Sequence, residues 1–247
     1  MKDTEFINRD NLSWYCNTNE TLLEEKPEGI VMEFPGLGGS SCLGGSLEMG
    51  PYVTEYAAEL AKNRLLLVYT FPGPWSWMNR GAVRMCDLIC TAAMDKYGLR
   101  DGCPLVATGG SMGGMGALIW TADTCHRVTA VAAACPGYDQ LAVWDKLDFP
   151  RTYMSSACCY DGSIEEALRH VSPVYRTADF PDLPYYIVGD GLDECFPIEG
   201  MDAFVEKMRE AGKKVTYRRL EGLKHGEFTP ECRGELTEFV IRNGVLN

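Results

Sequence analysis

The residues best suited to chemistry form a glycine-rich pentad, GGSMG at 109–113, which matches the pattern G-x-S-x-G. An apolar run at 104–108 precedes the pentad, and small residues that favour a helix follow from Gly113. In this context the pattern predicts a sharp turn between a strand and a helix, with glycine on each side because a Cβ atom there would collide with neighbouring backbone. Such a turn holds a serine hydroxyl exposed, which makes Ser111 the candidate nucleophile.

Three histidines could supply the base that a serine nucleophile needs. His126 lies just before an expected strand, and therefore at the opposite edge of a parallel sheet from Ser111. His170 lies in a helix-like segment, where a solvated surface position is expected. His225 follows the expected strand at 214–220, at the same edge as Ser111. We therefore expect His225 to be the general base.

A carboxylate must fix the tautomer of this histidine and stabilise its charged form. Three acids follow the expected strand at 184–188, namely Asp190, Asp193 and Glu194. The stretch between Asp193 and His225 has room for one helix and one strand, which returns the histidine to the neighbouring strand end. Asp193 is therefore favoured. Asp190 is nearer the strand and is expected to cap the loop through its own backbone, but it stays the alternative acid.

The oxyanion that forms when a carbonyl is attacked must meet backbone N–H groups already in place. One is expected from Met112, the residue after the nucleophile. The other is expected from the loop PGLGGS at 35–40, from Leu37 or, as the alternative, from Gly38. A dinucleotide-binding interpretation of this loop fails, because Ser41 stands where the third glycine would be and no acidic residue ends the next strand.

Two tryptophans, Trp75 and Trp77, lie in the loop FPGPWSWM at 71–78, which follows an expected strand at the active edge. Their rings could bind an aromatic or acyl group of a substrate, or they could pack against the rest of the protein. Both alternatives stay open, and we carry Trp75 and Trp77 forward as candidate substrate-binding residues.

The eleven cysteines are scattered along the chain and include no CxxC pair. This pattern favours buried reduced thiols over a zinc site or a disulfide framework. We expect no bound metal, and hydrolysis by a serine nucleophile needs no cofactor.

Strand-like and helix-like stretches alternate from residue 29 onward, which indicates a mostly parallel sheet covered by helices on both faces. In such sheets ligands bind at the carboxyl ends of the strands. Residues 1–28 could supply an antiparallel edge hairpin, and residues 137–183 interrupt the alternation as a cap-like insertion over the site. We expect a single α/β domain over residues 1–247. The expected strands are 29–34, 64–71, 104–108, 128–134, 184–188 and 214–220, and the expected helices are 52–63, 82–97, one from 113, 201–211 and 229–244.

The formal net charge is −12, and no cluster of Lys or Arg interrupts the acidic excess. A nucleic-acid partner is therefore not expected. The chain shows neither a secretory signal nor an apolar stretch long enough to span a membrane, so no membrane partner is expected. We expect a cytoplasmic protein that acts on a small-molecule ester, and the sequence leaves open whether it forms a homo-oligomer.

The order Ser, Asp, His on successive strand ends, with the oxyanion loop ahead of them, resembles the α/β-hydrolase fold over residues 29–243. The stretches SPVY at 172–175, GDGLDECFP at 189–197 and GLKHGEF at 222–228 are similar to the esterase and prolyl-oligopeptidase-like branch, which includes acetyl and feruloyl esterases. The resemblance covers most of the chain.

This resemblance implies Ser111 as nucleophile, Asp193 as acid and His225 as base. Many relatives carry His-Gly before the oxyanion residue, whereas this chain has PG at 35–36, which leaves the second oxyanion donor open. We expect a serine hydrolase that cleaves carboxylic esters through an acyl-enzyme intermediate. A small peptidase, a thioesterase, an acyltransferase and a ligand-binding protein without turnover are the alternatives.

Overall fold

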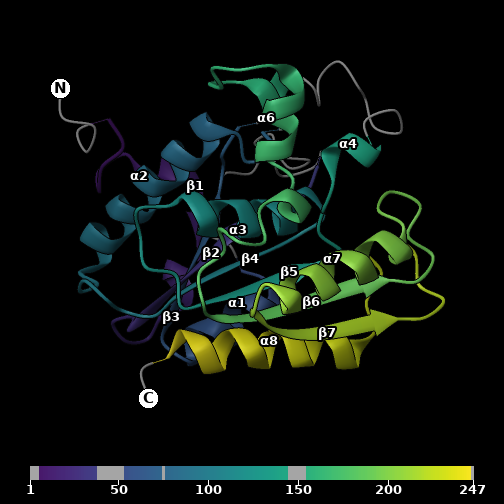
Figure 1. Cartoon of the computed structure of the whole chain (residues 1–247). Coiled ribbons are helices and arrows are strands. Elements are labelled where there is room, and N and C mark those ends of the chain that lie inside the picture. The colour runs from purple at the N-terminus through teal and green to yellow at the C-terminus, as the bar shows by residue number, and fades with distance from the viewer. Residues whose placement is uncertain (1–5, 38–52, 74–75, 144–153, 246–247) are drawn as a thin grey trace.

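The structure is a computed structural model that describes residues 6–37, 53–73, 76–143 and 154–245. Its centre is a seven-stranded sheet in the order β1-β3-β2-β4-β5-β6-β7 (Figure 1). β1 runs antiparallel to β3, and all other neighbouring strands pair in parallel. The strands are β1 (Cys16–Thr18), β2 (Gly29–Phe34), β3 (Leu65–Thr70), β4 (Leu105–Gly110), β5 (Ala130–Ala134), β6 (Pro184–Asp190) and β7 (Lys214–Leu220).

Helices cover both faces of the sheet, which confirms the predicted fold class. One face carries α2 (Arg80–Tyr97), α3 (Met112–Asp123) and α7 (Ile198–Glu210), and the other carries α1 (Glu55–Lys62) and α8 (Pro230–Gly244) (Figure 1). Each face has its own apolar core, because the strands between them are buried on both sides. This two-sided burial is the reason that the strands β2 to β6 read as largely apolar runs, whereas the edge strand β7 is mostly exposed or half-buried and carries charged residues.

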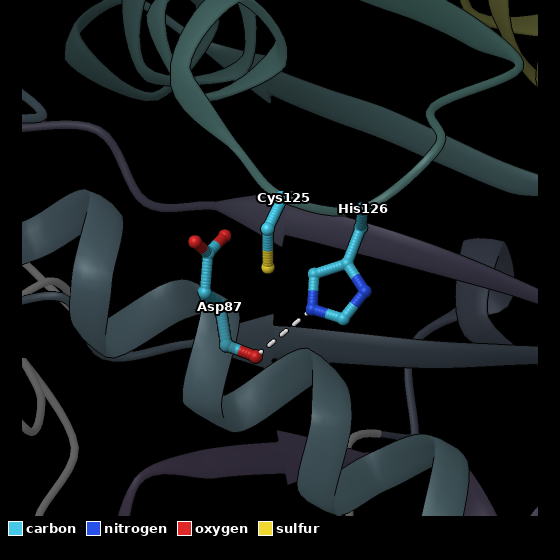
Figure 2. Close-up of side chains that lie close together, drawn as sticks. All are labelled: Asp87, Cys125 and His126. Carbon is cyan, nitrogen blue, oxygen red and sulfur yellow. Dashed lines mark hydrogen bonds between the residues drawn. The ribbon is translucent and has the colours of Figure 1, made fainter. Parts of the chain in front are cut away.

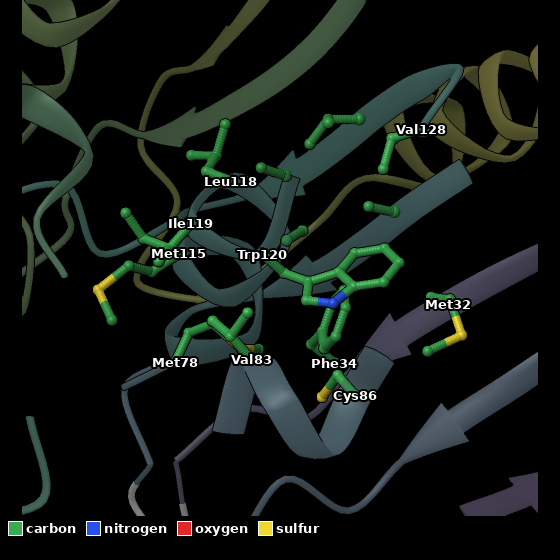
Figure 3. Packing of buried hydrophobic residues seen from close by; sticks show 14 of the residues in the cluster. Met32, Phe34, Met78, Val83, Cys86, Met115, Leu118, Ile119, Trp120 and Val128 are labelled. Atoms are coloured by element: carbon green, nitrogen blue, oxygen red, sulfur yellow. The ribbon is translucent and has the colours of Figure 1, made fainter. Parts of the chain in front are cut away.

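The larger core lies between the sheet and the helices α2, α3 and α7. Figure 3 shows part of it, with Phe34 of β2 packed against Trp120 of α3. The two ring centroids are 5.3 Å apart. All five residues of β5 are buried and four of them are alanine, which leaves room for α3 to pack close to the sheet.

The helices begin and end where short polar residues and glycine predict. The side chains of Thr54, Asn79 and Thr229 each accept a hydrogen bond from a backbone N–H in the first turn of α1, α2 and α8. Gly98 ends α2 in the left-handed conformation, with φ of 61°. α7 begins at Ile198, three residues before the expected start at Met201, and Pro197 is its N-cap residue.

The N-terminal segment differs from the expected hairpin. From residue 6 to residue 28 the structure contains one strand, β1, and two 3₁₀ turns, η2 (Leu12–Trp14) and η3 (Glu20–Leu22). Asn19 explains the arrangement. Its buried side chain donates to the backbone carbonyls of Ala57 and Leu65 and accepts from the N–H of Leu67, so the chain after β1 is tied to α1 and β3 instead of returning as a second strand.

The segment between β5 and β6 contains α4 (Gln140–Val143), α6 (Ile164–His170) and η5 (Pro173–Tyr175). Figure 1 shows α4 and α6 on the same side of the sheet as α2 and α3. The hydroxyl of Tyr138 donates to the carbonyl of Pro197 at 3.0 Å, which joins this segment to the start of α7. Within the described residues, no helix combines the length and the apolar character that crossing a membrane requires.

Candidate active site

Ser111 occupies the turn that joins β4 to α3. Its backbone adopts φ of 57° and ψ of −124°, a strained conformation for a residue with a side chain. The turn is held from both sides, because the N–H of Ser111 donates to the carbonyl of Ala134 at 2.9 Å and the N–H of Gly137 donates to the carbonyl of Ser111 at 3.3 Å. The strand, the sharp turn and the helix thus stand in the order that the pentad predicts.

The two outer glycines of the pentad lie where no side chain fits. A Cβ atom at Gly109 would lie 2.5 Å from the carbonyl carbon of Gly113, and a Cβ atom at Gly113 would overlap the carbonyl oxygen of Phe34. The start of α3 therefore packs directly against the end of β2. This close approach brings the loop after β2 beside the serine.

His225 joins Ser111 to Asp193 in one hydrogen-bonded row. Nε2 of His225 lies 2.8 Å from Oγ of Ser111, and Nδ1 lies 2.7 Å from Oδ2 of Asp193. An ionised carboxylate only accepts hydrogen bonds, so Nδ1 carries the ring proton and Nε2 is the acceptor of the serine proton. The side chain of Asp193 is 1% exposed and that of His225 is 23% exposed, so the carboxylate is shielded while the imidazole is partly open to solvent.

The loop after β6 fixes the orientation of Asp193. Its Oδ1 atom accepts hydrogen bonds from the backbone N–H groups of Cys195 and Phe196, both at 2.8 Å. The ring of Phe196 also lies beside the imidazole of His225, with centroids 5.7 Å apart. These contacts leave Oδ2 of Asp193 directed at the histidine.

Asp190 contacts the backbone next to the histidine. It is 1% exposed at the end of β6, and its Oδ2 atom accepts a hydrogen bond from the N–H of Gly226 at 2.9 Å. Burial raises the pKa of Asp190, although the hydrogen bond from Gly226 opposes the shift. Glu194 is exposed. Among these three acids, it is Asp193 that accepts the described hydrogen bond from Nδ1 of His225.

The two expected oxyanion donors flank the serine. Met112 is the first residue of α3, where backbone N–H groups have no partner inside the helix. A Cβ atom built on Gly36 would lie 3.9 Å from Cβ of Ser111, so the loop that contains Leu37 passes close to Ser111. Gly38 lies outside the described residues. The choice between Leu37 and Gly38 stays a prediction.

Of the two tryptophans proposed for substrate binding, the structure describes Trp77 alone. Trp75 lies outside the described residues. Trp77 is 1% exposed and packs in the larger core, with φ of 47°. Little of the indole surface is therefore open to a ligand in this structure, and a role for Trp77 in substrate binding stays a prediction.

The other two histidines lie in hydrogen-bonded clusters away from Ser111. Nε2 of His170 pairs with Asp123 at 3.1 Å. Nε2 of His126 lies 3.1 Å from the backbone carbonyl of Asp87, next to the thiol of Cys125 (Figure 2). Sequence reasoning expected a solvated His170, and its partly buried contact with Asp123 was not visible in the local pattern.

Three clusters in the described residues contain side chains that could ligate a metal ion. Two of them include His225, whose ring nitrogens already bond to Ser111 and Asp193. The third contains Asp87, Cys125 and His126 (Figure 2). There the polar atoms are engaged as well, because Asp87 accepts a hydrogen bond from the indole of Trp120 at 2.9 Å, so we assign no metal to these clusters.

Among the comparisons with known proteins, the search of solved structures gave matches. A scan against protein-family models gave no match, and a search of curated proteins gave none either. A puromycin hydrolase matches with a TM-score of 0.66 and 22% identity, over 90% of this chain and 35% of that chain. The acylaminoacyl peptidase of Pyrococcus horikoshii matches with a TM-score of 0.70 and 15% identity, over 90% of this chain and 38% of that chain.

A thermophilic esterase from Thermogutta terrifontis, solved with butyrate bound, matches with a TM-score of 0.57 and 16% identity. The match covers 90% of this chain and 85% of the esterase. Together these likenesses show that the chain has the α/β-hydrolase fold. The chain spans only a little over a third of the length of the puromycin hydrolase and of the acylaminoacyl peptidase.

Proposed function

We propose that this protein is a serine hydrolase of carboxylic esters that works through an acyl-enzyme intermediate. The observation that carries the proposal is the row of hydrogen bonds from Ser111 through His225 to Asp193, at 2.8 and 2.7 Å. A serine held on a strained turn, a base within reach of its proton and a shielded carboxylate behind the base together form a system for nucleophilic attack on a carbonyl.

In the first half of the proposed reaction, Nε2 of His225 takes the proton of Ser111 as Oγ bonds to the ester carbonyl carbon. The carbonyl oxygen becomes an oxyanion, for which the N–H groups of Met112 and Leu37 are the proposed donors. Asp193 stays ionised and stabilises the charged imidazole. The ester C–O bond then breaks, and the alcohol leaves with the proton from His225.

In the second half, water replaces the alcohol. His225 takes a proton from the water molecule as the water oxygen attacks the acyl carbon, and the bond to Oγ of Ser111 breaks as the serine recovers that proton. The carboxylic acid product leaves, and the starting protonation state returns. None of these steps requires a metal or an organic cofactor.

A peptidase is the second candidate function. The matches to a puromycin hydrolase and an acylaminoacyl peptidase favour it, because the same three residues can cleave an amide. The match to an esterase with butyrate bound favours a short acyl group. An acetyl or feruloyl esterase is the finer form of our proposal, in keeping with the local sequence similarity at 172–175 and 222–228.

The remaining expectations belong to this proposal. Residues 1–247 would form one domain, with 137–183 as a cap-like insertion near the site. The substrate would be a small ester, and the net charge of −12 argues against a nucleic-acid partner. A cytoplasmic location stays part of the proposal.

Turnover of a defined substrate panel tests the proposal. The panel contains p-nitrophenyl acetate and butyrate, a cinnamoyl ester and an aminoacyl p-nitroanilide. We expect release of product from the esters by the wild type and by Ser13→Ala, which removes an exposed serine hydroxyl, and loss of turnover in Ser111→Ala. Cleavage of the anilide at a higher kcat/KM than every ester would favour the peptidase, and no cleavage of any panel member would favour a binding protein.

A further inference from the structure

A cavity of about 380 Å³ lies behind the turn that carries Ser111, on the face of the sheet covered by α1 and α8. The carboxyl ends of β2, β4 and β5, the start of α1, Phe228 and the first two turns of α8 line it. Its volume falls in the range of small-molecule sites. Its lining includes the backbone of Gly109 and Gly110 but neither Ser111 nor His225, so this cavity is separate from the proposed ester site. We call it the Glu33 cavity after its acidic residue.

Glu33 is the penultimate residue of β2, whose sequence GIVMEF is otherwise apolar. Side chains alternate along a strand, so Glu33 points to the same face as Val31, which packs in the core beneath α1 and α8. The Oε2 atom of Glu33 is shielded from solvent and has no hydrogen-bond partner among the described residues. A buried carboxylate oxygen without a partner is costly, because it has lost water and gained nothing in return.

The side chains around Glu33 do not balance its negative charge with a positive one. Burial raises the pKa of Glu33 to about 7, so both the charged and the neutral form are populated near neutral pH. The basic residue in the lining is Arg233, whose guanidinium stacks over the ring of Phe228 at 5.4 Å from its centroid. Within the described part of the chain no salt bridge joins Glu33 to a basic side chain.

The remaining walls are largely apolar. Tyr56, Phe228 and Leu236 line the cavity around the carboxyl group. A complementary ligand therefore needs a cationic hydrogen-bond donor for Glu33 and a compact apolar body for the walls. An anionic ligand would meet the carboxylate and be repelled.

We propose that the Glu33 cavity is a binding site for a small primary amine, which enters as an ammonium ion and donates a hydrogen bond to Oε2 of Glu33. This site goes beyond the proposed ester hydrolysis. Its ligand would rest against the backbone of Gly109 and Gly110, directly behind the nucleophile turn.

Isothermal titration calorimetry with benzylamine tests the proposal, with benzyl alcohol and benzoate as probes of the same shape. We expect benzylamine to bind the wild type and to bind Glu33→Gln at least about tenfold more weakly, because the variant keeps the shape of the side chain but loses its charge. Glu238→Gln removes an exposed carboxylate of α8 that does not line the cavity, and it should bind as the wild type does. Thr237→Phe, which narrows the cavity while leaving Glu33 in place, should also lose binding.

The pH dependence gives a second readout. Benzylamine stays protonated between pH 6 and 8, whereas a carboxyl with a pKa near 7 changes from mostly neutral to mostly ionised. The affinity of the wild type should therefore rise about tenfold over this interval, and that of Glu33→Gln should stay flat. Absence of binding to the wild type, equal binding by Glu33→Gln, or equal binding of benzyl alcohol would each overturn the proposal. Because none of the probes is an ester, these results are independent of whether the protein hydrolyses esters.

Discussion

The two carboxylates near His225 allow a matched pair of isosteric substitutions. In Asp193→Asn we expect the amide oxygen to take the place of Oδ1, because the backbone N–H groups of Cys195 and Phe196 both donate to that position at 2.8 Å. The amide nitrogen then faces Nδ1 of His225, where a carboxylate oxygen now lies 2.7 Å away. Since that nitrogen is a donor, Nδ1 must accept, and the ring proton moves to Nε2, which can no longer take the proton of Ser111.

The expected loss in kcat for Asp193→Asn is about ten-thousandfold, or roughly 5 kcal/mol in the activation free energy. Asp190→Asn keeps an oxygen that can accept the N–H of Gly226 and leaves Asp193 in place, so its loss should be less than about tenfold. Steady-state hydrolysis of p-nitrophenyl acetate measures both effects, with unfolding midpoints to show that both variants fold. Retention of more than about a tenth of the activity by Asp193→Asn, or an equal loss in Asp190→Asn, would refute the tautomer argument.

Three further predictions concern stability. Gly113→Ala places a methyl group against the carbonyl oxygen of Phe34 and should lower the free energy of unfolding by about 2 kcal/mol or more. Gly234→Ala, with open space around it in α8, should raise the free energy of unfolding by roughly 0.5–1 kcal/mol. Urea denaturation measures both, and the opposite ranking of the two variants would contradict this packing. The folded pKa of Glu33, about 7, lies above its ordinary value of 4.5, so the stability from protonated Glu33 is complete below pH 4.5 and is lost as the pH rises through 7. The free energy of unfolding of Glu33→Gln relative to the wild type should therefore increase by up to about 3 kcal/mol from pH 4.5 to pH 8.5, and a difference that does not change with pH argues against a shifted carboxyl. Asn19→Ala removes three buried hydrogen bonds to backbone and should cost about 3 kcal/mol in urea denaturation, with a cost below about 1 kcal/mol as the contrary result.

The alternation of apolar runs and helical periodicity was enough to predict the architecture. The strands β2 to β6 are mostly buried, so each reads as a largely apolar run. Residues such as Gly98 and Thr229 end and begin helices where their backbone preferences require. The N-terminal segment was harder, because the position of β1 depends on Asn19. The hydrogen bonds of Asn19 reach residues nearly forty positions and more along the chain, which no local pattern encodes.

The sequence predicted the three residues that the structure brings into one hydrogen-bonded row, Ser111, His225 and Asp193, and their catalytic roles stay predictions. The pentad around Ser111 has a local signature, and strand order then limits which histidine and which acids can reach it. The sequence favoured Asp193 over Asp190, and the coordinates add the partner of each acid: Asp193 lies 2.7 Å from Nδ1 of His225, whereas Asp190, the last residue of β6, accepts the N–H of Gly226. The burial of Trp77 likewise follows from tertiary packing.

Glu33 was missed because the run GIVMEF was interpreted as simply apolar. The signal was present, since an acidic residue within a strand that is otherwise buried on both faces contradicts the apolar pattern and has to be explained. Sequence alone could not show that its carboxylate faces a cavity. The cavity forms only where α1 and α8 come together in the folded chain, because residues of both helices line it.

The identity of the nucleophile is the claim on which the proposed function rests, and covalent labelling tests it most directly. The protein is treated with a fluorophosphonate, and the modified residue is located by mass spectrometry of its peptides. We predict one adduct, on the peptide that contains Ser111, and no adduct in Ser111→Ala. An adduct on another residue, such as Cys195, or full labelling of Ser111→Ala would contradict the account.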